Sequence, residues 1–131
     1  MNAKHYVSLE VAKMLKEKGY NKECDYCFYY DDYHDKWDFD SPYNLFDDDP
    51  MYYNNETIDD EMYSMPTLLE AMDWLEERGV KIGFYHTSYS GWCYTLNNSK
   101  ICYISETKST KRYTDRNECM NAAIKKGVEL L

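Results

Sequence analysis

Two cysteines and a histidine have the spacing that comes nearest to a metal site in this sequence. Cys24 and Cys27 have the two-residue gap of a zinc half-site, and His34 could be a third ligand. A structural zinc site needs four ligands in a tetrahedron, usually as two local pairs. The sequence has no second Cys-x-x-Cys and no His-x-x-x-His. We therefore expect ordinary strand cysteines, no metal and no cofactor.

The remaining groups that could do chemistry lack the patterns that catalysis needs. Residues 47–49 are adjacent aspartates, whereas a calcium loop places its acids at alternate positions. There is no G-x-S-x-G elbow, no glycine-rich phosphate loop and no H-E-x-x-H pair. His86 is expected on the core face of a strand, as a hydrogen-bonded structural histidine and not as a general base. The sequence indicates a protein that is not an enzyme.

A three-stranded antiparallel meander over residues 80–106 organises the predicted fold. Apolar and polar residues alternate there in three runs, namely 80–87, 92–96 and 101–103. A turn over 97–100 would pair Leu96 with Ile101 and Tyr94 with Tyr103. This register places the large apolar side chains on one face, which then needs a cover.

Helices are expected to cover one face of this sheet. The three expected helices span residues 8–18, 67–78 and 115–130. Ser8 is the expected N-cap of the first, and residues 67–70 form a capping box at the second. Gly127 indicates close packing in the third helix or an early end to it. A hairpin over residues 24–40 is a candidate extension of the sheet, so the prediction is an α+β fold.

Length and composition indicate one globular domain over residues 1–131. Apolar residues make up 44% of the chain and aromatic residues 17%, which argues against disorder. No apolar run approaches the roughly 18 residues of a membrane span, and the first residues lack an apolar signal core. Five cysteines in a chain of this length indicate reduced thiols in a cytoplasm, including those of Cys93 and Cys102.

The net charge of −9 is concentrated in the middle of the chain. Residues 21–66 hold fourteen acids against two lysines, a net charge of −12, and residues 1–20 and 67–131 carry +2 and +1. Eight tyrosines lie in the same segment. Tyrosine gives rigid contact area with a hydrogen-bonding tip, which binding surfaces favour. These rings either face a partner or fill a second small core beneath the long connection over residues 41–66.

We therefore expect a non-enzymatic module that binds a protein partner, with a basic surface as the complement of the acidic segment. The residues expected to contact this partner are Tyr29, Tyr30, Asp31, Asp32, Tyr33, Trp37, Tyr43, Asp47, Asp48, Asp49, Tyr52 and Tyr53.

Three segments carry a resemblance to other proteins. Residues 6–20, 65–75 and 91–94 resemble segments of small uncharacterised α+β proteins from gut anaerobes and their phages. The resemblance spans nearly the whole chain, implies an α+β fold and transfers no site. A phage accessory factor is one expected role. Another is a structural or self-associating phage protein, with the other face of the predicted sheet (Tyr85, Thr95 and Ile104) as its contact.

The order of elements over residues 66–131 is similar to that of double-stranded-RNA-binding domains. Both have a helix, three strands and a helix, and residues 117–126 are similar to the last helix of those domains. The resemblance implies nucleic-acid binding as an alternative function. The residues that could then contact phosphates are Lys108, Lys111, Arg112 and Arg116.

Overall fold

A computed structural model describes residues 1–46, 53–88, 91–98, 105–109 and 111–131, with the backbone alone described at 105–108. Its contacts group the chain into two compact units. Unit 1 comprises Met1–Tyr6 and Thr67–Leu131, and unit 2 comprises Val7–Pro66. Helices and antiparallel sheets build the chain, so the predicted α+β class is confirmed. The single domain expected from the length stays a prediction.

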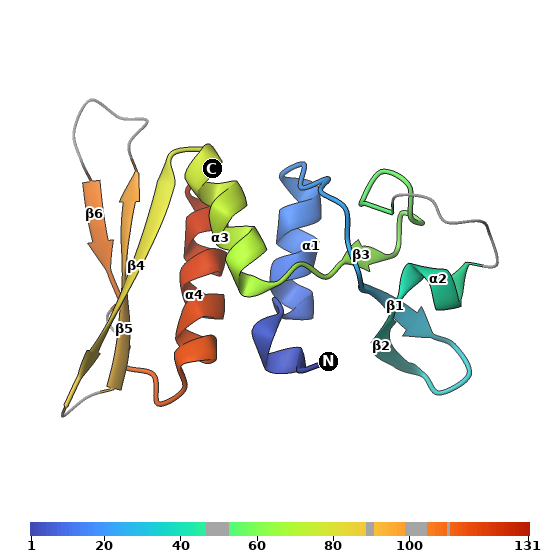
Figure 1. The fold of residues 1–131 in the computed structure, drawn as a ribbon, viewed down its shortest axis with the longest axis horizontal. Coiled ribbons are helices and arrows are strands. Elements are labelled where there is room, and N and C mark those ends of the chain that lie inside the picture. The colour runs from blue at the N-terminus through green and yellow to red at the C-terminus, as the bar shows by residue number, and fades with distance from the viewer. Residues whose placement is uncertain (47–52, 89–90, 99–104, 110) are drawn as a thin grey trace. The chain divides into compact units, whose positions relative to one another are not determined.

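Unit 1 is an antiparallel sheet with two helices on one face (Figure 1). Its elements are η1 (Ala3–His5), α3 (Leu68–Glu77), β4 (Val80–Thr87), β5 (Gly91–Asn98), β6 (Ser105–Lys108) and α4 (Arg116–Glu129). The strand order is β4-β5-β6, α3 contacts β4, and α4 contacts α3, β4 and β5. The predicted meander and its two flanking helices are therefore confirmed.

The start of α3 follows from its capping box. Thr67 Oγ1 accepts a hydrogen bond from Glu70 N at 3.1 Å, and the Glu70 carboxylate accepts one from Thr67 N at 3.0 Å. These two bonds satisfy amides that the first turn of a helix leaves without partners. Leu68, Ala71 and Leu75 on the inner side of α3 are buried.

Helix α4 packs closely against α3 and β4. Its stripe of buried residues includes Gly127. A Cβ atom added at Gly127 would lie 3.0 Å from Leu75 Cδ1 and 3.3 Å from Val80 Cγ1. Close packing is thus the reason for glycine here, and the helix continues to Glu129.

The pairing of β5 with β6 differs from the predicted register. Leu96 pairs with Thr107, and Ser109 N donates to Tyr94 O at 3.0 Å. The predicted pairs with Ile101 and Tyr103 are wrong, because Asn97 and Asn98 continue the ladder instead of turning. Ile101 and Tyr103 themselves lie outside the described residues.

His86 does not lie in the core as predicted. It is exposed near the end of β4, and its ring contacts the Trp92 ring edge-on, with 5.1 Å between the centroids. The residue directly across from it on β5 is Trp92, so the two rings meet as a cross-strand pair.

Unit 2 has its own sheet. Its elements are α1 (Leu9–Glu17), β1 (Cys27–Asp31), β2 (Lys36–Asp40), α2 (Pro42–Leu45) and β3 (Tyr63–Ser64). The strand order is β2-β1-β3. The 24–40 hairpin therefore does not extend the 80–106 sheet, because the edge of β1 that does not pair with β2 pairs with β3. Helix α1 also belongs to this unit and contacts β3, and its expected place over the meander stays a prediction.

The predicted N-cap of α1 is confirmed. Ser8 Oγ accepts a hydrogen bond from Val11 N at 3.3 Å, and Gly19 ends the helix with φ +91°. That backbone conformation favours glycine, because a Cβ atom would be strained there. Val11, Ala12 and Leu15 are the buried residues of this helix.

A second small core lies in unit 2. Its buried members are Cys24, Cys27, Tyr53, Ile58 and Met62. Tyr29, Leu45 and Phe46 pack against it. The described part of the 41–66 connection is therefore ordered around these side chains, as the buried-core alternative predicts.

The two places where the chain passes between the units are adjacent. Tyr6 and Thr67 form an antiparallel bridge, and Val7 N donates to Pro66 O at 3.1 Å. Unit 2 is thus one continuous segment whose ends lie next to each other, whereas unit 1 is built from two segments.

Among the described residues, no helix has both the length and the apolar character that crossing a membrane requires.

Candidate functional site

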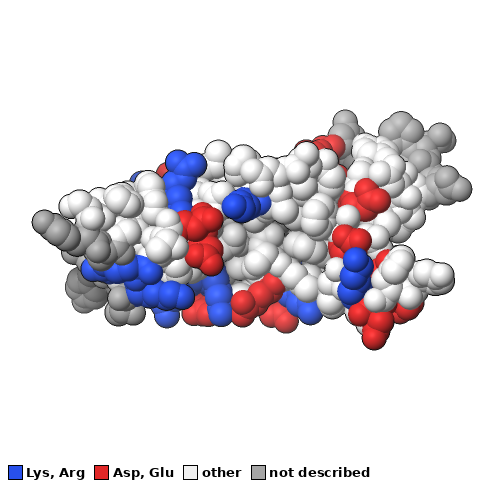
Figure 2. Space-filling view, turned by 90° about the horizontal axis from the view of Figure 1, so that it is seen from below, with Lys and Arg blue, Asp and Glu red and all other residues white. Residues whose placement is uncertain are grey.

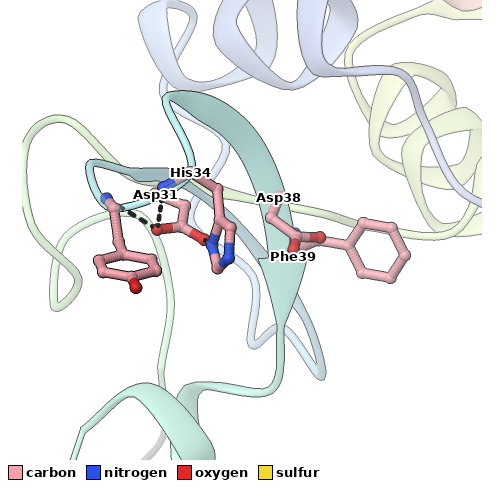
Figure 3. Close-up of polar contacts among 5 residues, drawn as sticks. Asp31, His34, Asp38 and Phe39 are labelled. Atoms are coloured by element: carbon pink, nitrogen blue, oxygen red, sulfur yellow. Dashed lines mark hydrogen bonds and ion pairs between the residues drawn. The ribbon is translucent and has the colours of Figure 1, made fainter.

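The turn between β1 and β2 is organised by one carboxylate (Figure 3). Asp31 Oδ1 accepts hydrogen bonds from Tyr33 N at 3.1 Å and His34 N at 3.2 Å, and its Oδ2 lies 2.6 Å from His34 Nδ1. The His34 side chain is the main reason why the pKa of Asp31 lies below its ordinary value. A fixed turn therefore holds the ring of Tyr33 in solvent, where it is 92% exposed.

The other strand of the hairpin ends beside α2. Figure 3 also draws Asp38 and Phe39 of β2, where Phe39 N donates to Asp38 Oδ1 at 2.8 Å. Further along, Asp40 Oδ1 accepts from Ser41 N at 2.7 Å and from Asn44 Nδ2 at 3.0 Å. These local bonds fix the direction in which the chain leaves the hairpin and enters α2.

Trp37 supports the neighbouring aromatic rings from within unit 2. Its ring centroid lies 5.6 Å from that of Tyr30 and 5.9 Å from that of Tyr63. The amine of Lys13 lies 4.8 Å from the centroid of the same ring, within cation–π range. Tyr30 is 41% exposed, and its hydroxyl donates to the Asp35 carboxylate, which raises the pKa of Tyr30.

A groove of about 620 Å³ lies beside the hairpin, and we call it the acidic groove. Leu45, Phe46 and Met62 give it apolar surface. Two phenol rings and four carboxylates complete the lining, namely Tyr29, Tyr30, Asp32, Asp59, Asp60 and Glu61. Such a lining offers apolar contact together with acceptors for several cationic groups.

Lys16 holds the loop that brings three of these acids to the groove. Its Nζ donates to the carbonyl oxygens of Asp59 at 3.0 Å, Asp60 at 3.2 Å and Met62 at 2.7 Å. Burial lowers the pKa of Lys16, and the carboxylates of Asp60 and Asp59 oppose this effect. Because the amine binds backbone oxygens, the side chains of Asp59, Asp60 and Glu61 stay exposed.

The structure separates the predicted partner-binding residues into four groups. Tyr30, Asp32, Tyr33 and Tyr43 are exposed, and Tyr29, Asp31 and Trp37 are half-buried. Asp47, Asp48, Asp49 and Tyr52 lie outside the described residues. Tyr53 is 6% exposed and stacks on Phe46 at 5.3 Å between centroids, so its prediction as a contact residue is wrong.

The sequence patterns do not mark Lys16, Asp59, Asp60 or Glu61 as site residues. The consecutive acids at 59–61 were a signal for an exposed acidic turn. No local signal connected Lys16 with them, because this contact spans more than forty residues.

The cysteine pair of unit 2 is buried. Cys27 Sγ lies 3.8 Å from Asp40 O as a hydrogen-bond donor, and burial raises the pKa of this thiol to about 12. The Nδ1 of His34, the suggested third ligand, lies 2.6 Å from Asp31 Oδ2. Within the described ranges, no group of three or more His, Cys, Asp or Glu side chains could hold a metal ion.

The basic residues of the nucleic-acid alternative lie between β6 and the start of α4. Arg112 Nη1 donates to Ser109 O at 3.2 Å, and the Lys111 amine lies 5.1 Å from the Tyr113 ring centroid. Both side chains and that of Arg116 are exposed, and nothing is described of the Lys108 side chain. Of the expected self-association residues, Tyr85 is 37% exposed, Thr95 is half-buried and Ile104 lies outside the described residues.

Comparisons of the chain with protein-family models, curated proteins and solved structures find no match.

Proposed function

We propose that unit 2 binds a basic segment of a partner protein, with the acidic groove and the exposed rings of Tyr30 and Tyr33 as its contact surface. The observation that carries the proposal is the lining of the groove, which combines four acidic residues with apolar ones. A lysine- or arginine-rich segment matches both features, because its aliphatic stems suit the apolar surface and its cationic heads suit the carboxylates.

The charge of unit 2 supports the same partner. Sixteen acids stand against five lysines over Val7–Pro66, a net charge of −11. Two of these lysines, Lys13 and Lys16, contact aromatic rings or backbone oxygens of their own unit. Figure 2 shows acidic side chains at the right of the view, where Figure 1 places the β1–β2 hairpin, and also left of centre and along the lower edge, where Lys and Arg lie among them. A field of this sign speeds the approach of a cationic partner.

The tyrosines supply the contact area that exposed charges alone do not. Charges at the rim of an interface mainly change the association rate, whereas buried aromatic rings dominate affinity. Tyr33 is held outward by the Asp31 turn, and Tyr30 is braced by Trp37. The backbone of Tyr33 and the ring of Tyr30 are therefore positioned before binding, which lowers the entropic cost of the interface.

The proposed role is that of a non-enzymatic accessory protein of a phage or mobile element, acting in the cytoplasm. The resemblance described from the sequence supports this setting, and the geometry of unit 2 supports the partner.

The test uses an arginine-rich peptide as the probe and fluorescence anisotropy of the labelled peptide as the measurement. The triple variant Asp59→Asn, Asp60→Asn, Glu61→Gln removes three charges from the acidic groove. Lys16 binds backbone oxygens in this loop, so the loop anchor survives these changes. We expect the dissociation constant to rise roughly tenfold at low salt, about 1.4 kcal/mol.

The matched control is Asp73→Asn, Glu76→Gln, Glu118→Gln. It removes the same charge from exposed acids of unit 1, and it should change the affinity much less. Equal weakening by both variants would show that only the total charge matters and would overturn the proposal. Retention of duplex RNA at low salt, lost in Lys111→Gln, Arg112→Gln, would favour the nucleic-acid alternative instead.

A further inference from the structure

Unit 1 contains a groove that the proposed function does not use, and we call it the unit 1 groove. Its volume is about 690 Å³. It lies among η1, the start of α3, the β4–β5 pair and the first turns of α4. Its apolar lining consists of Leu68, Leu69, Met72, Phe84, Trp92 and Met120. Leu69, the second residue of α3, is 66% exposed, so apolar surface is open to solvent here.

The charge of the unit 1 groove is opposite to that of the whole chain. The chain has 24 acids and a net charge of −9, yet no Asp or Glu is among the described residues that line this groove. Its basic lining residues are Arg116 and His5. The Arg116 guanidinium lies 6.0 Å from the Trp92 ring centroid, and within the described part of the chain it has no ion-pair partner. An apolar groove with one such cation is complementary to an apolar anion.

We propose that the unit 1 groove binds a small amphipathic carboxylate, whose apolar body packs on the groove wall and whose carboxylate meets Arg116. A guanidinium can donate two parallel hydrogen bonds to a carboxylate, a geometry that an ammonium lacks. The volume lies within the range of roughly 300–1,000 Å³ that is typical of small-molecule sites. A nucleic acid does not fit, because a polyanion needs a row of cations and the lining is mostly apolar.

The two methionines of the lining make binding observable. Both Met72 and Met120 are half-buried at the groove, and a methyl-¹³C label reports contact at each one separately. Decanoate, kept below its micelle concentration, is the probe, and decanol is the uncharged probe with the same chain. The full-length protein is used throughout.

We expect decanoate to shift the methyl signals of Met72 and Met120 and to bind wild type roughly tenfold more tightly than decanol does, about 1.4 kcal/mol. Arg116→Gln should lower decanoate affinity by a similar factor and leave decanol affinity unchanged. Lys126→Gln removes a positive charge from the same helix at its other end, where Lys126 pairs with Glu129, and should leave both affinities unchanged.

Three outcomes would overturn the proposal. The first is an absence of shifts at both methionine methyls, and the second is equal affinity of wild type for decanoate and decanol. The third is equal weakening by Arg116→Gln and Lys126→Gln, which would show a general charge effect. The arginine-rich peptide test on unit 2 is unaffected by any of these results, so the two proposals fail independently.

Discussion

Lys16 and Cys27 show two opposite uses of a titratable side chain in unit 2. Lys16 keeps a cationic amine against three backbone oxygens, although burial lowers its pKa. Cys27 is fully buried in the small core, and burial there favours its neutral thiol. The first side chain positions the acidic loop, and the second fills space without contributing a charge.

The raised pKa of Cys27 predicts how stability changes at alkaline pH. The unfolded chain releases this thiol proton near pH 9.0, whereas the folded chain keeps it up to about pH 12. The free energy of unfolding should therefore fall over this window, by up to about 1.4 kcal/mol per pH unit from this group. Urea unfolding of wild type and Cys27→Ala at several pH values measures it, because the difference cancels most other titrations.

The contribution of Cys27 is fully present below pH 9.0 and is lost toward pH 12. A decline of the same slope in the Cys27→Ala variant would contradict the assignment to this thiol. The sequence predicts that Cys27 is an ordinary strand cysteine, and its place in a strand could be read from the strand pattern. The size of the pKa change could not, because it depends on Tyr53, Ile58 and Met62, which come from a distant part of the chain.

At the scale of elements, the close approach of α4 to α3 and β4 gives a test of packing against helix propensity. Replacing glycine by alanine inside a helix normally stabilises it by about 1 kcal/mol. At Gly127 the new methyl group would press on Leu75 and Val80, which are 0% and 1% exposed. Overpacking a buried site costs about 1–3 kcal/mol, so Gly127→Ala should destabilise the protein by about 1 kcal/mol.

Urea unfolding of Gly127→Ala measures this balance. Ala122→Gly on the same helix, at a half-buried position, calibrates the ordinary propensity cost of glycine. A gain in stability for Gly127→Ala close to the loss in Ala122→Gly would show that the site has room for a methyl group.

Local elements were more predictable than their pairing. The caps at Ser8 and Thr67 could be read from the sequence, because each depends on residues within one turn of a helix. The register of β5 with β6 could not, because two asparagines typical of a turn also tolerate half-buried strand positions. A strand pair fixes its register through contacts across the sheet, not through the local residues alone.

At the scale of the whole molecule, the uneven charge has a consequence for stability. Unit 2 carries −11, and the remaining charge of the chain is +2, which together give −9. Like charges within unit 2 repel one another in the folded state, and salt screens this repulsion. The thermal midpoint should therefore rise between about 0.01 M and about 0.15 M salt, over which the Debye length falls from about 30 Å to about 8 Å.

Differential scanning calorimetry measures this shift. The Asp59→Asn, Asp60→Asn, Glu61→Gln variant should show a smaller rise, because it lowers the charge density of unit 2. A midpoint that falls with salt would mean that attractive pairs outweigh the repulsion.

The division of the chain could not be predicted from sequence. Composition marks the acidic middle, but the boundary at Tyr6 and Thr67 depends on a bridge between residues sixty positions apart. The candidate contact surface was only partly predictable, because only some of its residues are placed by local contacts. The hairpin tyrosines are local, whereas the burial of Tyr53 and the anchor at Lys16 depend on long-range contacts.

The adjacency of Val7 and Pro66 also fixes an order of events on the ribosome. Everything that unit 2 needs has been synthesised by Pro66, while unit 1 still lacks both of its long helices and every strand. We therefore expect the acidic unit to acquire its shape first, on a nascent chain. Tyr6 must wait for Thr67 before it finds its neighbour.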